Sequence, residues 1–142
     1  MDYTFYAKTT DETREIGRKI AEIAQNDGVL LLGGDLGAGK TTLSGGIGEF
    51  LGISDEITSP SFVVNKKYAD ENGDTVLSHY DFYRLGDDVG IMGDELREDI
   101  FNELFVVIEW GGSVLNFLPR PYWRAKISME KDARKITLEK IA

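Results

Sequence analysis

The chain has 142 residues and carries 16 Lys and Arg against 25 Asp and Glu, which gives a formal net charge of −9. This charge opposes autonomous tight binding to a nucleic-acid backbone, and zero cysteines exclude disulfides, thiolate metal sites and a thiol nucleophile. The length is that of one domain, so we expect residues 1–142 to form a single domain. No apolar run is long enough to cross a bilayer and the first eight residues lack signal-peptide features, so we expect a cytoplasmic protein without a membrane partner.

The first predicted element is an amphipathic helix. Thr9-Thr10-Asp11-Glu12 has the T-x-x-E form of a capping box, and apolar residues then recur at helical spacing from Ile16 to Ala24. Asn26-Asp27-Gly28 ends the helix with a turn. The four apolar residues 29–32 follow, and they predict a strand that is buried on both faces.

A glycine-rich segment follows this strand. Residues 34–41 fit G-x-x-x-x-G-K-[ST] and lie between the strand and a helix predicted to open at Thr41. Glycines allow successive N–H groups to line an anion nest, Lys40 would reach the β- and γ-phosphates, and the Thr41 hydroxyl would bind Mg²⁺. The segment therefore predicts a phosphate-binding loop, the alternative being a glycine-rich turn that matches by accident.

The helix that follows the loop contains three glycines. Each of Gly45, Gly46 and Gly48 destabilises a helix by about 1 kcal/mol relative to alanine, so we expect close packing there.

A β-hairpin is predicted in the middle of the chain. After a turn-like stretch from Ile53 to Pro60, Phe62-Val63-Val64 begins a strand that runs towards Tyr68. Residues 70–74 form a connection around Asn-Gly, and residues 75–80 form the returning strand.

In the remaining third of the chain, the apolar pattern predicts a weak helix over residues 94–100 and a second buried strand over residues 104–108. It also predicts an edge hairpin in the tail. In the tail, residues 130–132 form the turn between two alternating segments. Their apolar positions are Trp123, Ala125, Ile127 and Met129, then Ile136 and Leu138.

An acidic residue ends the second buried strand. Val106-Val107-Ile108-Glu109 has the form of the second acidic element of P-loop NTPases, in which a strand holds a carboxylate near the bound metal. We expect Glu109 to serve Mg²⁺ directly or through a water molecule. The alternative is a carboxylate that faces solvent at the end of a strand.

Four motifs in this order carry a family resemblance. They are residues 34–42, Ser59-Pro60-Ser61-Phe62, residues 79–85 and Ile108-Glu109-Trp110. Together they resemble the TsaE family, also called YjeE, the P-loop ATPases of bacterial tRNA threonylcarbamoyladenosine (t6A) biosynthesis. The resemblance spans about residues 9 to 119.

The resemblance implies a fold, an activity and partners. The fold would be an α/β P-loop NTPase-like sheet with flanking helices. Family members bind ATP and Mg²⁺, hydrolyse ATP weakly alone, and act with TsaD and TsaB in modifying adenosine 37 of tRNAs that read ANN codons. Because the chain is acidic, we expect tRNA to meet it only through the complex.

The resemblance also assigns residues to the site. Asp81 would support the metal or the attacking water, Thr41 and Glu109 would hold the metal, and Thr10 would lie near the nucleotide base. The nucleotide contacts carried over by motif are Leu36, Gly37, Ala38, Gly39, Lys40, Thr41 and Thr42.

The resulting hypothesis is phosphoryl transfer to water, with Lys40, Asp81 and Glu109 as the catalytic residues. One rival is a small P-loop kinase acting on a small-molecule acceptor, although no arginine-rich lid segment is evident. The other is a GTPase-like switch, but the only Asn-Lys segment, at residues 65–67, is not followed by an aspartate and comes too early in the chain.

The neighbouring side chains of the third motif have plainer interpretations. His79 is the only histidine, which makes a zinc site improbable and favours a buried, hydrogen-bonded role near Asp81. Tyr80, Phe82 and Tyr83 are expected to be core and interface aromatics. For Arg84 we expect a salt bridge to a neighbouring acid rather than an arginine-finger role.

Overall fold

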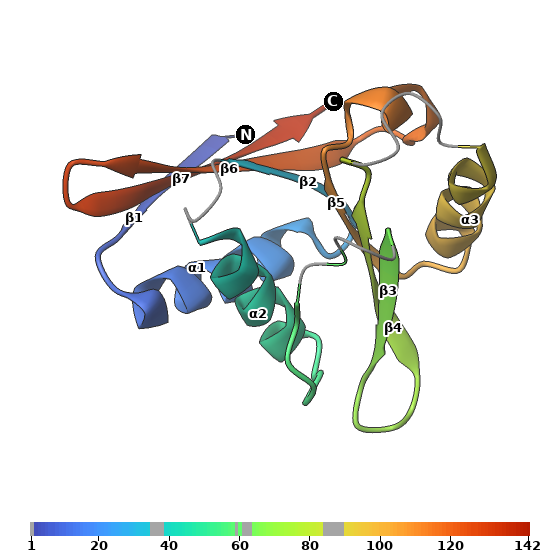
Figure 1. Cartoon of the computed structure of the whole chain (residues 1–142), viewed down its shortest axis with the longest axis horizontal. Coiled ribbons are helices and arrows are strands. Elements are labelled where there is room, and N and C mark those ends of the chain that lie inside the picture. Colours follow the sequence, from blue (N-terminus) through green and yellow to red (C-terminus); the bar gives the residue numbers. More distant parts are fainter. Residues whose placement is uncertain (1, 35–38, 59, 61–63, 84–89) are drawn as a thin grey trace.

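Strands from both ends of the chain build one mixed sheet. The computed structural model describes residues 2–34, 39–58, 60, 64–83 and 90–142, and within these ranges seven strands pair in the order β1-β7-β6-β2-β5-β4-β3 (Figure 1). The strands are β1 (Asp2–Ala7), β2 (Val29–Gly34), β3 (Asn65–Ala69), β4 (Thr75–Asp81), β5 (Phe105–Glu109), β6 (Tyr122–Glu130) and β7 (Ala133–Ile141). Strands β6, β2, β5 and β4 run parallel to one another, and the outer pairs are antiparallel.

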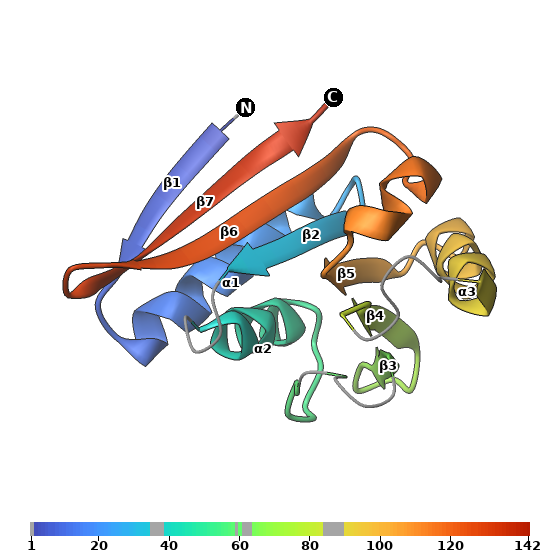
Figure 2. The same cartoon turned by 45° about the horizontal axis from the view of Figure 1, so that its top comes forward.

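Helices cover both faces of this sheet, which confirms the predicted α/β class. They are α1 (Thr10–Ala24), α2 (Lys40–Phe50), α3 (Gly90–Phe101) and the 3-10 helix η1 (Gly112–Phe117). Figure 2 shows α1 and α2 together on one face, while α3 and η1 lie at the β5–β4 side. Two separate apolar cores follow from this arrangement, one under α1 and α2 and one under α3 and η1. None of the helices in the described ranges is long and apolar enough to cross a membrane.

The elements with strong local signals form as predicted. The capping box of α1 is present, because the Thr9 hydroxyl accepts a hydrogen bond from the Glu12 N–H and the Glu12 carboxylate accepts one from the Thr9 N–H. Strand β2 is buried from Val29 to Leu32. The hairpin between β3 and β4 turns at residues 70–74.

Glycines allow α1 and α2 to pack backbone against backbone. A Cβ added to Gly46 of α2 would lie 2.0 Å from the Arg14 carbonyl oxygen, and one added to Gly17 of α1 would lie 2.2 Å from the Leu43 carbonyl oxygen. A Cβ at Gly48 would meet Ile57 at 2.7 Å. Close packing is therefore confirmed for Gly46 and Gly48. The prediction of close packing is wrong for Gly45, where a Cβ would meet no atom within 4 Å.

Two substitutions in α2 separate these cases. We expect Gly46→Ala to destabilise the protein by about 1–3 kcal/mol or more, because the added methyl overlaps backbone that cannot move aside without separating the helices. Gly45→Ala should stabilise it by about 0.5–1 kcal/mol, because alanine favours the helix and the methyl enters open space. Urea unfolding of both variants measures the difference. Equal stabilities would contradict the helix contact.

The sheet differs from the prediction at both ends of the chain. The tail hairpin is not at an edge, because β6 pairs with β2 and β7 pairs with β1, so β1 is the edge strand. Strand β1 was not predicted, although Tyr3, Phe5 and Ala7 alternate with more exposed residues. Met129, the last of the alternating apolar positions before the hairpin turn, is 55% exposed.

Smaller differences concern element limits. Strand β3 begins at Asn65, after Val64, whose φ is +68°; the predicted strand residues 62 and 63 lie outside the described residues. Helix α3 is longer than the predicted 94–100. The short helix η1 was not predicted, because six residues of 3-10 helix carry no periodic apolar signal.

Candidate functional site

Three parallel strands end side by side beside the start of α2. Strand β2 ends at Gly34 and α2 begins at Lys40, while Asp81 and Glu109 are the last residues of β4 and β5 and are register partners. The carboxyl ends of neighbouring parallel strands are where α/β sheets bind ligands. Leu36, Gly37 and Ala38, three of the predicted contacts, lie outside the described residues.

The start of α2 has the features of an anion-binding helix end. Its N-cap, Gly39, has a φ of +108°, a conformation that favours glycine, and it supplies no side-chain acceptor to the first turn. The N–H groups of a first turn have no intrahelical partners, so they can donate to an anion. Thr41 is exposed here and Thr42 is half-buried. Both threonines border a cleft of about 320 Å³ that Gly45 also lines.

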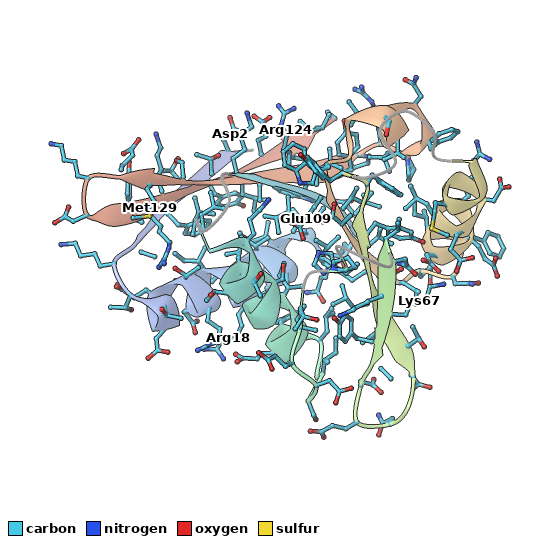
Figure 3. The ribbon with its side chains drawn as sticks, in the orientation of Figure 1. Asp2, Arg18, Lys67, Glu109, Arg124 and Met129 are labelled. Atoms are coloured by element: carbon cyan, nitrogen blue, oxygen red, sulfur yellow. The ribbon has the colours of Figure 1, made fainter. Side chains whose placement is uncertain are left out.

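The charged centre of the site joins α2 to β4 and β5. Lys40 Nζ lies 3.4 Å from Glu109 Oε1, and His79 Nε2 lies 2.7 Å from Glu109 Oε2. The side chains of Lys40, Glu109 and His79 are only 10%, 7% and 2% exposed. Figure 3 shows Glu109 in the interior, on the side of the sheet that α2 covers. The carboxylate of Glu109 therefore has a separate partner at each oxygen.

The surroundings of Glu109 favour its charged form. Burial raises the pKa of this carboxyl group. The hydrogen bond to His79 and the charge of Lys40 lower the pKa by more than burial raises it, so the net pKa lies below its ordinary value. A carboxylate ionised at neutral pH and held in the interior is suited to binding a cation or to neutralising Lys40.

Asp81 is buried beside Glu109. Its Oδ1 accepts a hydrogen bond of 3.0 Å from the Tyr83 N–H, and its own N–H donates to the Val64 carbonyl oxygen at 2.8 Å. Because parallel register partners place their side chains on the same face, Asp81 and Glu109 face the same side of the sheet. The turn after β4 therefore fixes one Asp81 oxygen.

Thr10 lies on a different element from the residues of this charged centre. It is exposed, as the first residue of α1. One turn further along α1, the Thr13 hydroxyl accepts a 3.5 Å hydrogen bond from Arg134 of β7. Arg134 also borders the α2 cap, because a Cβ added to Gly39 would lie 3.1 Å from its Nε. Arg134 therefore connects the start of α1 with the start of α2.

Sequence reasoning missed Arg134 and did not identify the hydrogen-bond partner of His79. Arg134 lies in the tail, where only a strand pattern was recognised, and no motif marks it. Its Nε is buried without a hydrogen-bond partner in the described part of the structure. His79 is buried and hydrogen-bonded as predicted, and its hydrogen-bond partner is Glu109, 30 residues away.

The aromatic residues divide between core and surface. Tyr80 and Phe82 are buried, as predicted, whereas Tyr83 is 66% exposed and contacts Trp110 in a tilted arrangement with ring centroids 4.8 Å apart. Trp110 has a φ of +57°, and its ring centroid lies 5.6 Å from Lys40 Nζ. The two rings therefore form an exposed aromatic pair beside the charged centre. Arg84 lies outside the described residues.

A buried polar network holds the opposite face of β4. Asp99 of α3 is 2% exposed and accepts hydrogen bonds from the Tyr80 hydroxyl and, at 2.6 Å, from the Ser78 hydroxyl. Lys67 of β3 lies 3.0 Å from the other Asp99 oxygen and also pairs with Glu95 (Figure 3). Burial and the hydrogen bond to Asp99 raise the pKa of Tyr80, so its hydroxyl stays protonated and donates.

We expect Asp99→Ala to destabilise the protein by about 2–4 kcal/mol, because it leaves two buried hydroxyls and Lys67 without their shared acceptor. Asp94→Ala is the matched control on the same helix, since Asp94 is 78% exposed and pairs with its helical neighbour Arg97. It should change stability by less than about 0.5 kcal/mol. Equal urea-unfolding midpoints for both variants would contradict the role of Asp99.

Comparisons with known proteins agree on one family. A family model described as "Threonylcarbamoyl adenosine biosynthesis protein TsaE" matches residues 7–136. The Bacillus subtilis tRNA threonylcarbamoyladenosine biosynthesis protein TsaE is 37% identical over 130 residues, covering 89% of this chain and 78% of that protein. The Streptomyces coelicolor protein of the same name is 35% identical over 114 residues, covering 80% and 77%. The crystal structure of Bacillus subtilis YdiB has a TM-score of 0.74 at 30% identity and covers 100% of this chain and 87% of that one.

Proposed function

The chain belongs to the TsaE family of threonylcarbamoyl adenosine biosynthesis proteins, and we propose that it is the ATP-binding and ATP-hydrolysing subunit of tRNA t6A37 modification. In this proposal residues 1–142 act as a single ATPase domain in the cytoplasm, together with TsaD and TsaB. The net charge of −9 supports a role in which tRNA is met only through these partners.

The contact between Lys40 and Glu109 is the observation that carries the proposal. A lysine at the start of a helix and a carboxylate at the end of an adjacent parallel strand, 3.4 Å apart and both largely buried, are the pair that phosphoryl transfer requires. Lys40 would turn towards the β- and γ-phosphates, with Leu36, Gly37, Ala38, Gly39 and Thr42 lining them and Thr10 near the base.

The residues present fit a magnesium ion. Mg²⁺ prefers oxygen ligands and is usually held by one or two carboxylates together with substrate phosphates and water. The Glu109 carboxylate, whose pKa is lowered, and the exposed Thr41 hydroxyl are donors of this kind. When bound, the ion would neutralise charge on the phosphates. Thr41 and Glu109 would hold it, while Asp81 would support the metal or orient the attacking water.

The test is ATP consumption by the purified chain with and without TsaD and TsaB, followed by t6A analysis of tRNA. We expect slow Mg²⁺-dependent hydrolysis alone, faster hydrolysis with both partners, and t6A formation that requires this chain. ATP consumption that appears only with an added small-molecule acceptor would favour a kinase instead. No binding of Mg²⁺–ATP at millimolar concentration would contradict the proposal.

A further inference from the structure

We propose that His79 is a positioning residue that holds the Glu109 carboxylate in place while Lys40 exchanges that carboxylate for the nucleotide phosphates. The inference rests on the proposed ATPase function. It begins from the two contacts of Glu109, one to Lys40 at 3.4 Å and one to His79 at 2.7 Å.

The two partners of Glu109 differ in their freedom to move. Lys40 has a long, flexible side chain at the start of a helix, so it can swing towards a phosphate. His79 lies inside β4, which pairs in register with β5, and its side chain is 2% exposed. When Lys40 turns away, His79 is the partner that remains. Its hydrogen bond then offsets part of the cost of keeping the Glu109 carboxylate away from water.

The surroundings of the His79 ring indicate which of its two nitrogens carries the hydrogen. Nδ1 of His79 is buried and has no hydrogen-bond partner within the ranges the structure describes, whereas Nε2 faces Glu109. A hydrogen on Nδ1 would be a buried donor without an acceptor, which is costly. The geometry therefore favours a ring hydrogen on Nε2, donated to Glu109.

This arrangement matches how proteins orient metal-binding side chains. A ligating carboxylate is itself hydrogen-bonded, and loss of that outer partner typically weakens metal binding by about 10–100-fold. His79 and Asp81 are two residues apart on β4, so both side chains face the same side of the sheet. One strand thereby supplies the support for Glu109 and the candidate water-orienting residue.

The first test needs no nucleotide or metal. Because His79 is the only histidine, the ¹⁵N-histidine spectrum of the whole chain reports this ring alone. We expect the Nε2–H form, with a signal that shifts in Glu109→Gln. A ring with its hydrogen on Nδ1, or a signal insensitive to Glu109→Gln, would overturn the proposal. This result does not depend on whether the chain hydrolyses ATP.

The second test measures binding of a non-hydrolysable ATP analogue across a Mg²⁺ titration. His79→Leu fills similar space without a donor, and we expect it to raise the apparent Mg²⁺ dissociation constant by about 10-fold or more. His79→Gln keeps an N–H donor and should stay within about threefold of the parent, while analogue binding without Mg²⁺ should be equal in all three. Equal Mg²⁺ dependence of His79→Leu and the parent would overturn the proposal. If the parent itself bound no Mg²⁺–analogue, the proposed function would fail instead.

Discussion

Replacing Lys40 by alanine should weaken ATP binding by about 2–5 kcal/mol, which is roughly 30-fold to several thousand-fold. The lysine supplies the mobile positive charge at the start of α2, and its side chain is only 10% exposed. The substitution also removes the lysine that pairs with Glu109 and leaves His79 as its remaining partner, so a less compensated negative charge faces the incoming phosphates. Calorimetric titration with ATP and Mg²⁺ measures the effect.

The matched control for this loss is Lys19→Ala. Lys19 is exposed on α1, so the substitution changes the net charge equally without touching the charged centre. We expect its ATP affinity to stay within about twofold of the parent, which separates a local contact from general electrostatic attraction. Unchanged ATP affinity in Lys40→Ala would rule out the phosphate role of this lysine. Thermal unfolding of both variants confirms that each is folded.

Replacing Glu109 by alanine should separate binding from turnover. Lys40 and the first turn of α2 remain to hold the phosphates, so we expect ATP affinity to change by less than about tenfold. Turnover should fall by at least about 100-fold, because a metal ion that stabilises charge in the transition state contributes several kcal/mol to the rate and Glu109 would be one of its ligands. Single-turnover hydrolysis and equilibrium binding measure the two quantities.

Two further variants show whether the loss of turnover in Glu109→Ala comes from the missing carboxylate. Glu109→Gln keeps the size of the side chain and should also lose turnover, which excludes a cavity as the cause. Glu98→Ala removes an exposed carboxylate from α3 and should hydrolyse ATP at the parental rate. If Glu109→Ala hydrolysed ATP as fast as the parent, the assignment of this residue to the metal would be wrong.

The elements that sequence reasoning located carry their signals within a few neighbouring residues. The Thr9–Glu12 capping box, the apolar run from Val29 to Leu32 and the turn at residues 70–74 are each decided by local geometry. The same holds for Glu109, whose place at the end of a strand follows from the three apolar residues before it.

Pairing across the sheet could not be predicted in this way. Alternation of Trp123 and Ala125 with polar residues reports that one face of β6 is buried, but it carries no information about which strands bond to the two edges. The tail was therefore placed at an edge, and β1, which occupies that edge, was overlooked because its six residues alternate only weakly.

The charged centre shows the same limit at the level of single residues. His79 and Glu109 are 30 residues apart, and they meet because β4 and β5 run parallel in a fixed register. The local pattern placed His79 near Asp81, its neighbour two positions along the strand. Arg134 reaches Gly39 from β7 in the same non-local way. Motif spacing thus identified the chemistry expected of this site, whereas its supporting partners depend on the tertiary fold.

The account depends most on one arrangement, in which Thr41 and Glu109 share a magnesium ion on the phosphates of ATP. A crystal structure of the chain with Mg²⁺ and a non-hydrolysable ATP analogue tests it directly. We predict an ion about 2.0–2.1 Å from the Thr41 hydroxyl, with Glu109 bound to it directly or through one water molecule and Lys40 moved to the phosphates. A nucleotide bound elsewhere, or an ion that contacts neither Thr41 nor Glu109, would contradict the account.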